Sequence, residues 1–227
     1  MSIFDINKDE LLQLSDVHLE ELIARLAEAE VASHGHSPAY VSWSGSINAS
    51  DDGIDVHVQV PVSEFKTGYI SRPDTIFQAK KHVMTPAAII KEMVDKEGLS
   101  TTIVEQVKKQ GSYIIVSLGD DCSPPMKMSR LKAMKESVAG VPGNQSAHLD
   151  FYDRSKLAQW MRQHPLVLLW VKRILGKGSS GWQPYAAWSN PPYGSDDTLI
   201  SAPGVKVRLP SDKGQSLDVI NAIVPMR

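Results

Sequence analysis

Three polar side chains on two short segments have the types and spacing that favour phosphodiester hydrolysis. Asp55 lies in GIDVHVQV, residues 53–60, and Gln78 and Lys80 lie two residues apart in FQAKK, residues 77–81. Side chains two apart in a strand share one face, so a carboxylate, an amide and an ammonium converge if the two segments pair. Such hydrolysis uses hard oxygen ligands for a cation such as Mg²⁺ or Mn²⁺, beside a positive side chain.

Each of these residues has an expected role at such a site. The Asp55 carboxylate, the Gln78 amide oxygen and the Ala79 carbonyl are candidate metal ligands, and Lys80 would sit at the attacking water. Taken singly, Asp55 can also be a turn residue that caps local backbone, and the other two can form a solvated strand face.

A further carboxylate is expected from the first helix, because glutamine at the second ligand position carries no negative charge. SDVHLEELIARLAEAEVASHG, residues 15–35, has a capping serine and apolar residues at helical spacing. Glu20 lies next to the apolar stripe of this helix, whereas Glu21 points further toward solvent. We therefore expect Glu20 to complete the site, with Glu21 as the alternative.

Alternating apolar segments and helical patterns along the chain predict an α/β fold with a mixed central sheet flanked by helices. The short connection between the second and third strands favours antiparallel pairing. The run SYIIVSL predicts an interior strand, and Pro165 should kink or interrupt the last helix. The expected strands are 39–46, 53–60, 75–81, 112–118 and 148–153, and the expected helices are 15–35, 85–98, 101–111, 126–140 and 155–176.

Composition divides the chain into a domain at 1–175 and an extension or linker at 176–227, where Gly, Pro and Ser dominate. Residues 1–60 hold 2 Lys/Arg against 11 Asp/Glu, and the remainder holds 22 against 15. A segment with a net charge of −9 is therefore followed by one with a net charge of +7. This asymmetry is compatible with a carboxylate site facing a polyanion. A single cysteine and the lack of a long apolar run predict a cytoplasmic protein without a membrane partner.

These motifs resemble the PD-(D/E)xK nucleases, specifically the Mrr-like branch whose motif reads Gln-x-Lys. LEELIARL resembles the start of its first helix, DDGID its Asp-x-Gly-x-Asp turn and FQAKK its Gln-x-Lys strand, all within residues 15–120. The resemblance implies a restriction-endonuclease-like fold, with Glu20, Asp55 and Gln78 as metal ligands, Lys80 as the catalytic lysine and Asp52 as the turn aspartate. The insertion at 61–73 departs from the pattern.

The wider pattern, with HPLVLLWVKRILG and GWQPYAAWS, resembles the N-terminal effectors of bacterial STAND-type ATPases in antiphage defence. This resemblance implies ATPase and sensor modules of the same polypeptide beyond Arg227. A double-strand break also requires two single-site copies to meet across one duplex, so we expect a homo-oligomer.

Double-stranded DNA is the expected substrate, and the predicted activity is that of a Mg²⁺-dependent endonuclease. Lys81, Lys127 and Arg130 are candidate phosphate contacts, although the helix that carries the last two can equally be a solvated face. His57 shares the face of Asp55 and is a candidate site neighbour. The alternative functions are a nuclease-fold module that binds nucleic acid without cutting it, or an oligomerisation module.

Overall fold

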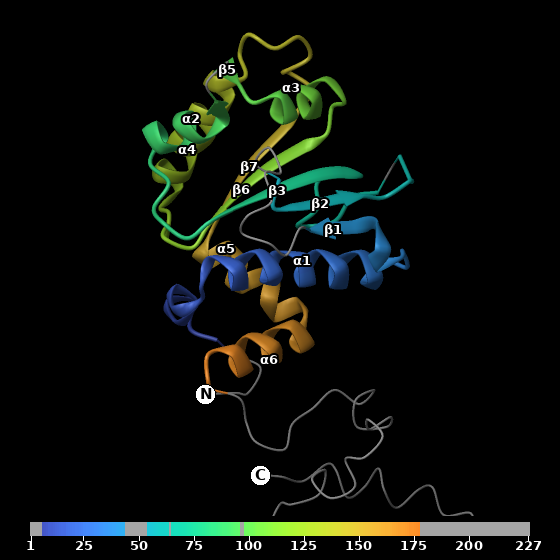
Figure 1. Cartoon of the computed structure of the whole chain (residues 1–227), viewed down its shortest axis with the longest axis vertical. Helices are drawn as coiled ribbons and strands as arrows, with labels where there is room; N and C mark the ends of the chain where they lie inside the picture. The colour runs from blue at the N-terminus through green and yellow to red at the C-terminus, as the bar shows by residue number, and fades with distance from the viewer. Residues whose placement is uncertain (1–5, 44–53, 64, 96–97, 178–227) are drawn as a thin grey trace, which may run out of the picture. The chain divides into compact units, whose positions relative to one another are not determined.

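Five strands form a mixed sheet in the computed structural model, which describes residues 6–43, 54–63, 65–95 and 98–177 (Figure 1). Their order is β1-β2-β3-β6-β7, in which β1, β2 and β3 are antiparallel and β3, β6 and β7 are parallel. The strands are β1 (Val41–Trp43), β2 (Val56–Gln59), β3 (Asp74–Lys80), β6 (Ser112–Ser117) and β7 (His148–Asp153). The expected α/β fold and the antiparallel pairing of β2 with β3 are confirmed.

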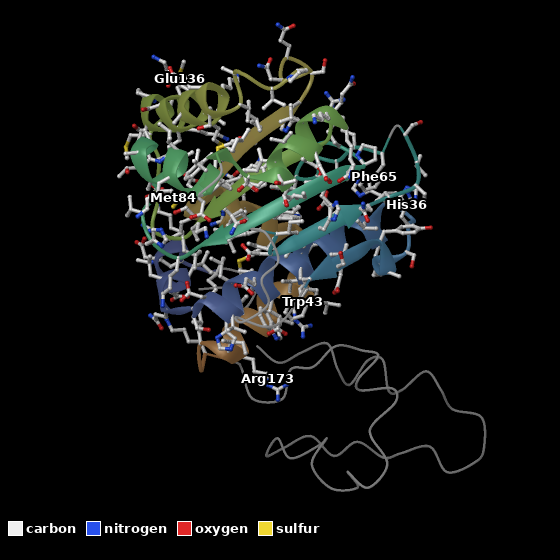
Figure 2. The ribbon with its side chains drawn as sticks, turned by 45° about the horizontal axis from the view of Figure 1, so that its top comes forward. His36, Trp43, Phe65, Met84, Glu136 and Arg173 are labelled. Carbon is white, nitrogen blue, oxygen red and sulfur yellow. The ribbon has the colours of Figure 1, made fainter. Side chains whose placement is uncertain are left out.

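Helices cover both faces of this sheet (Figure 1). One layer contains α1 (Asp16–Ser33), α5 (Arg154–Gln163) and α6 (Pro165–Ile174), and the other contains α2 (Pro86–Met93), α3 (Thr101–Lys108) and α4 (Pro124–Ser137). In Figure 2, Glu136 on α4 and Arg173 on α6 mark the two outer layers. A separate hairpin pairs β4 (Val94–Asp95) with β5 (Gly98–Leu99), and a 3₁₀ helix at Lys8–Gln13 precedes α1.

The helix ends follow from local sequence. The Ser15 hydroxyl accepts a hydrogen bond from the His18 N–H at 3.2 Å and caps α1, and the Thr85 hydroxyl caps α2 in the same way. Pro165 cannot donate a backbone hydrogen bond within a helix, and the chain breaks at His164 into α5 and α6. The interruption expected at this proline is confirmed.

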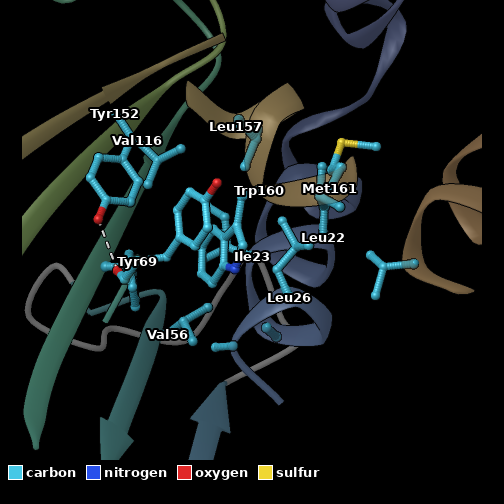
Figure 3. Close-up of a cluster of buried hydrophobic side chains, with 14 of the residues drawn as sticks. Leu22, Ile23, Leu26, Val56, Tyr69, Val116, Tyr152, Leu157, Trp160 and Met161 are labelled. Atoms are coloured by element: carbon cyan, nitrogen blue, oxygen red, sulfur yellow. Dashed lines mark hydrogen bonds between the residues drawn. The ribbon is translucent and has the colours of Figure 1, made fainter. Parts of the chain in front are cut away.

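The larger core lies between the sheet and the layer of α1, α5 and α6 (Figure 3). Trp160 of α5 is fully buried and stacks on Tyr69 with ring centroids 5.2 Å apart. The Tyr152 hydroxyl donates to the Tyr69 carbonyl at 2.8 Å. Aromatic packing of this kind anchors the segment before β3 against α5 and β7.

Side-chain alternation along β3 decides which layer each of its residues faces. Phe77 and Ala79 pack with the core of α1, whereas Ile76 packs with the core of α2, α3 and α4. Gln78 and Lys80 follow Ile76 at intervals of two and therefore project into the second layer. All six residues of β6 are buried, which confirms its expected interior position.

The described residues belong to one structural unit that ends at Lys177. Beyond Lys177, the predicted extension lies outside the described residues. Within the described ranges, no helix combines the length and apolar content needed to cross a bilayer.

Candidate active site

Asp55 lies where β2 begins, beside the carboxyl-terminal half of β3. The backbone N–H of Asp55 donates to the Phe77 carbonyl at 3.3 Å, which extends the ladder one residue beyond the Val56–Phe77 pair. One residue pair further, the Asp55 carboxylate itself accepts the Ala79 N–H through Oδ2 at 2.6 Å. The side chain thus takes the place of a strand carbonyl, and this contact holds the carboxylate against the Gln-x-Lys segment.

Gln78 contributes a buried oxygen that lacks a protein donor. Its side chain is 3 % exposed, and Oε1 has no hydrogen-bond partner within the described part of the chain. A buried polar atom left unpaired costs roughly 1–3 kcal/mol, so such an atom in a folded protein calls for an explanation. A donor or a cation supplied by a ligand would satisfy this oxygen.

Lys80 lies at the end of β3 in contact with a carboxylate that sequence reasoning did not identify. Its Nζ is 2.6 Å from Oε1 of Glu92, and the two side chains are 19 % and 28 % exposed. Glu92 belongs to α2, where it follows the buried Ile89 by three residues and precedes the buried Met93. That position at the border of the apolar stripe is the sequence signal that would have pointed to it.

The buried phenol of Tyr113 on β6 faces the same layer as Gln78 and Lys80. Burial raises the pKa of its phenol well above the usual range, and the negative charges of Glu92 and Asp55 raise it further. The phenol therefore stays protonated. The cluster of Asp55, Gln78, Lys80, Glu92 and Tyr113, called here the β3 cluster, thus occupies the sheet face below α2.

Glu20 lies in the other layer. It belongs to α1, whose buried side chains pack with Phe77 and Ala79 rather than with the layer that Gln78 and Lys80 enter. Glu21 accepts hydrogen bonds from Arg25 on the same helix, the shorter at 2.8 Å. A ligand role for Glu20 or Glu21 stays a prediction, whereas the carboxylate in contact with Lys80 comes from α2.

His57 shares the sheet face of Asp55 but bonds at the opposite end of β3. Its Nε2 is 2.7 Å from Oδ1 of Asp74, and Gln106 donates to the same oxygen at 2.9 Å. Burial alone would raise the pKa of Asp74, but the hydrogen bonds from His57 and Gln106 outweigh it and the pKa is lowered. His57 is thus held at the first residue of β3, away from Lys80 at the last. Asp52, the expected turn aspartate, lies outside the described residues.

The three candidate phosphate contacts have different environments. Lys81 is partly exposed beside Lys80, and Lys127 forms an ion pair with Asp150 at 3.0 Å. Arg130 is 5 % exposed, binds the buried Asp120 and lies 5.6 Å from the Phe151 ring centroid. A buried charge with its partner is not available to a phosphate, so we correct the expectation that Arg130 belongs to a DNA surface.

The donors of the β3 cluster suit a hard divalent cation. Asp55 and Glu92 supply carboxylates and Gln78 supplies its unpaired amide oxygen. The Ala79 carbonyl points to the same side of β3 as its N–H, toward Asp55. Among the described residues, no three His, Cys, Asp or Glu side chains gather as a metal-binding group, so amide, carbonyl and water oxygens would have to complete the coordination. Oxygen donors without nitrogen or sulfur favour Mg²⁺ or Mn²⁺ over Zn²⁺.

Comparisons of this chain with known protein families, with curated proteins and with solved structures found no match.

Proposed function

We propose that the chain is a Mg²⁺- or Mn²⁺-dependent nuclease that hydrolyses phosphodiester bonds of double-stranded DNA at the β3 cluster. The observation that carries the proposal is the buried, unpaired Oε1 of Gln78, next in sequence to Ala79, whose N–H holds the Asp55 carboxylate, and two residues before Lys80 on the same strand. The resemblance of the Asp55 and Gln-x-Lys segments to Mrr-like nucleases supports the same assignment.

The protein's own groups have separate tasks in this proposal. The Ala79 N–H orients the Asp55 carboxylate, and burial keeps the Gln78 amide oxygen away from bulk water. Lys80 places a positive charge where negative charge develops on the phosphate and orients the attacking water. A bound divalent cation would neutralise phosphate charge and favour deprotonation of water.

The basic balance of the chain after residue 60 supports a polyanionic substrate, because 22 Lys/Arg stand there against 15 Asp/Glu. Lys81 lies directly beside the cluster and is a further phosphate contact in the proposal. The resemblance to antiphage effectors adds a proposed context, in which clustering of copies by an ATPase module controls the activity.

A nuclease-fold module that binds nucleic acid without cutting it is the second candidate. The observation in its favour is the 2.6 Å ion pair between Lys80 and Glu92, which engages the lysine that cleavage would require. Gln78 also supplies no charge to hold a cation. Under this alternative, DNA binding survives the removal of Mg²⁺ and no strand is cut.

Single-turnover cleavage of a labelled duplex tests the proposal with three proteins. Wild type should cut only with Mg²⁺ or Mn²⁺, and Lys80→Ala should lose cleavage while it retains its fold. Lys109→Ala is the matched control, because it removes a lysine whose side chain is 57 % exposed on the surface near α3. Equal cleavage by Lys80→Ala and Lys109→Ala would refute the role of Lys80, and binding without cleavage by wild type would favour the second candidate.

A further inference from the structure

The three motif residues of the β3 cluster, Asp55, Gln78 and Lys80, carry too little negative charge for a cation site. At neutral pH the Asp55 carboxylate carries −1, Lys80 carries +1 and Gln78 is neutral. Three residues with no net charge provide little attraction for a divalent cation. A second carboxylate has to lie within the same cluster if a cation is to bind well.

Glu92 meets this requirement on geometry. It projects from α2 over the face that carries Gln78 and Lys80, and its Oε1 contacts Lys80 Nζ at 2.6 Å. Asp55 accepts the N–H of Ala79 and Glu92 contacts the side chain of the next residue, Lys80, so both carboxylates lie at the carboxyl-terminal end of β3. A carboxylate has two oxygens, so Glu92 can keep Lys80 on one of them and offer the other to a cation.

We propose that Glu92 is the second carboxylate ligand of the divalent-cation site, and that it replaces from α2 the negative charge that Gln78 lacks on β3. The inference rests on the cation requirement in the proposed function. In the motif pattern the second carboxylate comes from β3 or from the first helix. In this inference it comes from α2, a helix between β3 and β6.

Mn²⁺ binding to the full chain, measured by titration calorimetry without DNA, tests the inference. Glu92→Gln removes the charge and the ligand, whereas Glu92→Asp keeps the charge and withdraws the carboxylate by one methylene. Glu105→Gln is the matched control, because Glu105 lies on α3 with its side chain 61 % exposed. Thermal unfolding of each variant without metal verifies that the fold is unchanged.

We expect Glu92→Gln and Glu92→Asp each to weaken Mn²⁺ binding by about tenfold or more, since even outer-shell partners of metal ligands contribute 10–100-fold. Glu105→Gln should bind within about twofold of wild type, because its exposed charge is screened by solvent and salt. Wild-type affinity in Glu92→Gln would overturn the inference. So would wild-type affinity in Glu92→Asp alone, because it would show that charge matters and ligand geometry does not.

Asp55→Asn separates the failure of this inference from the failure of the proposed function. If Asp55→Asn loses Mn²⁺ and Glu92→Gln keeps it, the site exists without Glu92 and only the inference fails. If both variants lose Mn²⁺ but wild type cuts no DNA, the ligand assignment holds and the nuclease proposal fails. Absence of Mn²⁺ binding by wild type would refute both.

Discussion

Substitution of Asp55 by alanine or by asparagine distinguishes two tasks of one carboxylate. In the structure, Oδ2 accepts the Ala79 N–H at 2.6 Å, and in the proposal the negative charge of the same group holds a cation. Alanine removes both the acceptor and the charge. Asparagine removes the charge but retains an oxygen that can accept the Ala79 N–H.

The size of the structural effect follows from this hydrogen bond. A hydrogen bond to a charged acceptor contributes roughly 1.5–3 kcal/mol, and partial exposure of Asp55 favours the lower part of that range, about 1.5–2 kcal/mol. In a protein of 150–250 residues each kcal/mol shifts Tm by about 2–4 °C. Asp55→Ala should therefore lower Tm by about 3–8 °C, and Asp55→Asn by less than about 2 °C.

Both variants should lose cleavage by on the order of 100-fold or more, as expected when one preorganised electrostatic group is removed. Thermal unfolding is measured by circular dichroism with EDTA, so that bound metal does not contribute, and cleavage is measured on a plasmid with Mg²⁺. An unchanged Tm in Asp55→Ala would refute the structural role of the Ala79 contact. Wild-type cleavage by Asp55→Asn would refute the role of the charge.

Four further predictions concern the buried charges and the assembly. Glu30 accepts hydrogen bonds from Trp160 and His164 at 2.9 and 2.7 Å. Glu30→Gln should therefore lower the free energy of unfolding, measured with urea, by about 2–4 kcal/mol, and a decrease below about 1 kcal/mol would contradict this. Burial would raise the pKa of Glu30, but hydrogen bonds from His164, Thr67 and Trp160 outweigh it and lower the pKa. The stability that Glu30 contributes should therefore be present above about pH 4.5 and disappear as the pH falls through the lowered pKa. A stability difference between wild type and Glu30→Gln that stays constant in acid would contradict that sign. Arg130→Met should cost about 3–5 kcal/mol in the same assay, because it leaves the Asp120 charge buried without its cation, and an unchanged urea midpoint would refute this. Double-strand cleavage per chain should rise with protein concentration or after fusion to a dimeric carrier, and constancy under dilution would contradict control by assembly.

Patterns that depend on neighbours in sequence were sufficient for most of the fold. The apolar run at 112–118 predicted the buried β6, and Pro165 predicted the break between α5 and α6, because both effects act within a few residues. The alternation around Asp55 and Gln78 likewise predicted a shared sheet face, and the short connection predicted antiparallel pairing. The helix expected at 85–98 was too long: α2 ends at Met93 and the β4–β5 hairpin follows, whose two strands of two residues each are too short to give an alternating pattern.

The residues that sequence reasoning missed or misplaced depend on contacts between distant segments. Glu92 borders the apolar stripe of α2, but the sequence does not show that it meets Lys80, because that contact forms only when α2 packs near the end of β3. His57 reaches Asp74 rather than the β3 cluster because the antiparallel register brings the two together. Arg130 is buried because Asp120, at the end of β6, provides a charge partner that no helical pattern indicates.

Cation-dependent cleavage by wild type and by Asp55→Asn, compared on the same supercoiled plasmid, tests the central claim most directly. Nicked and linear products should appear only with Mg²⁺ or Mn²⁺, disappear with EDTA and be absent with Asp55→Asn at a Tm close to that of wild type. Cleavage that persists in EDTA, or that proceeds at the wild-type rate in Asp55→Asn, would contradict a metal-dependent nuclease site at the β3 cluster.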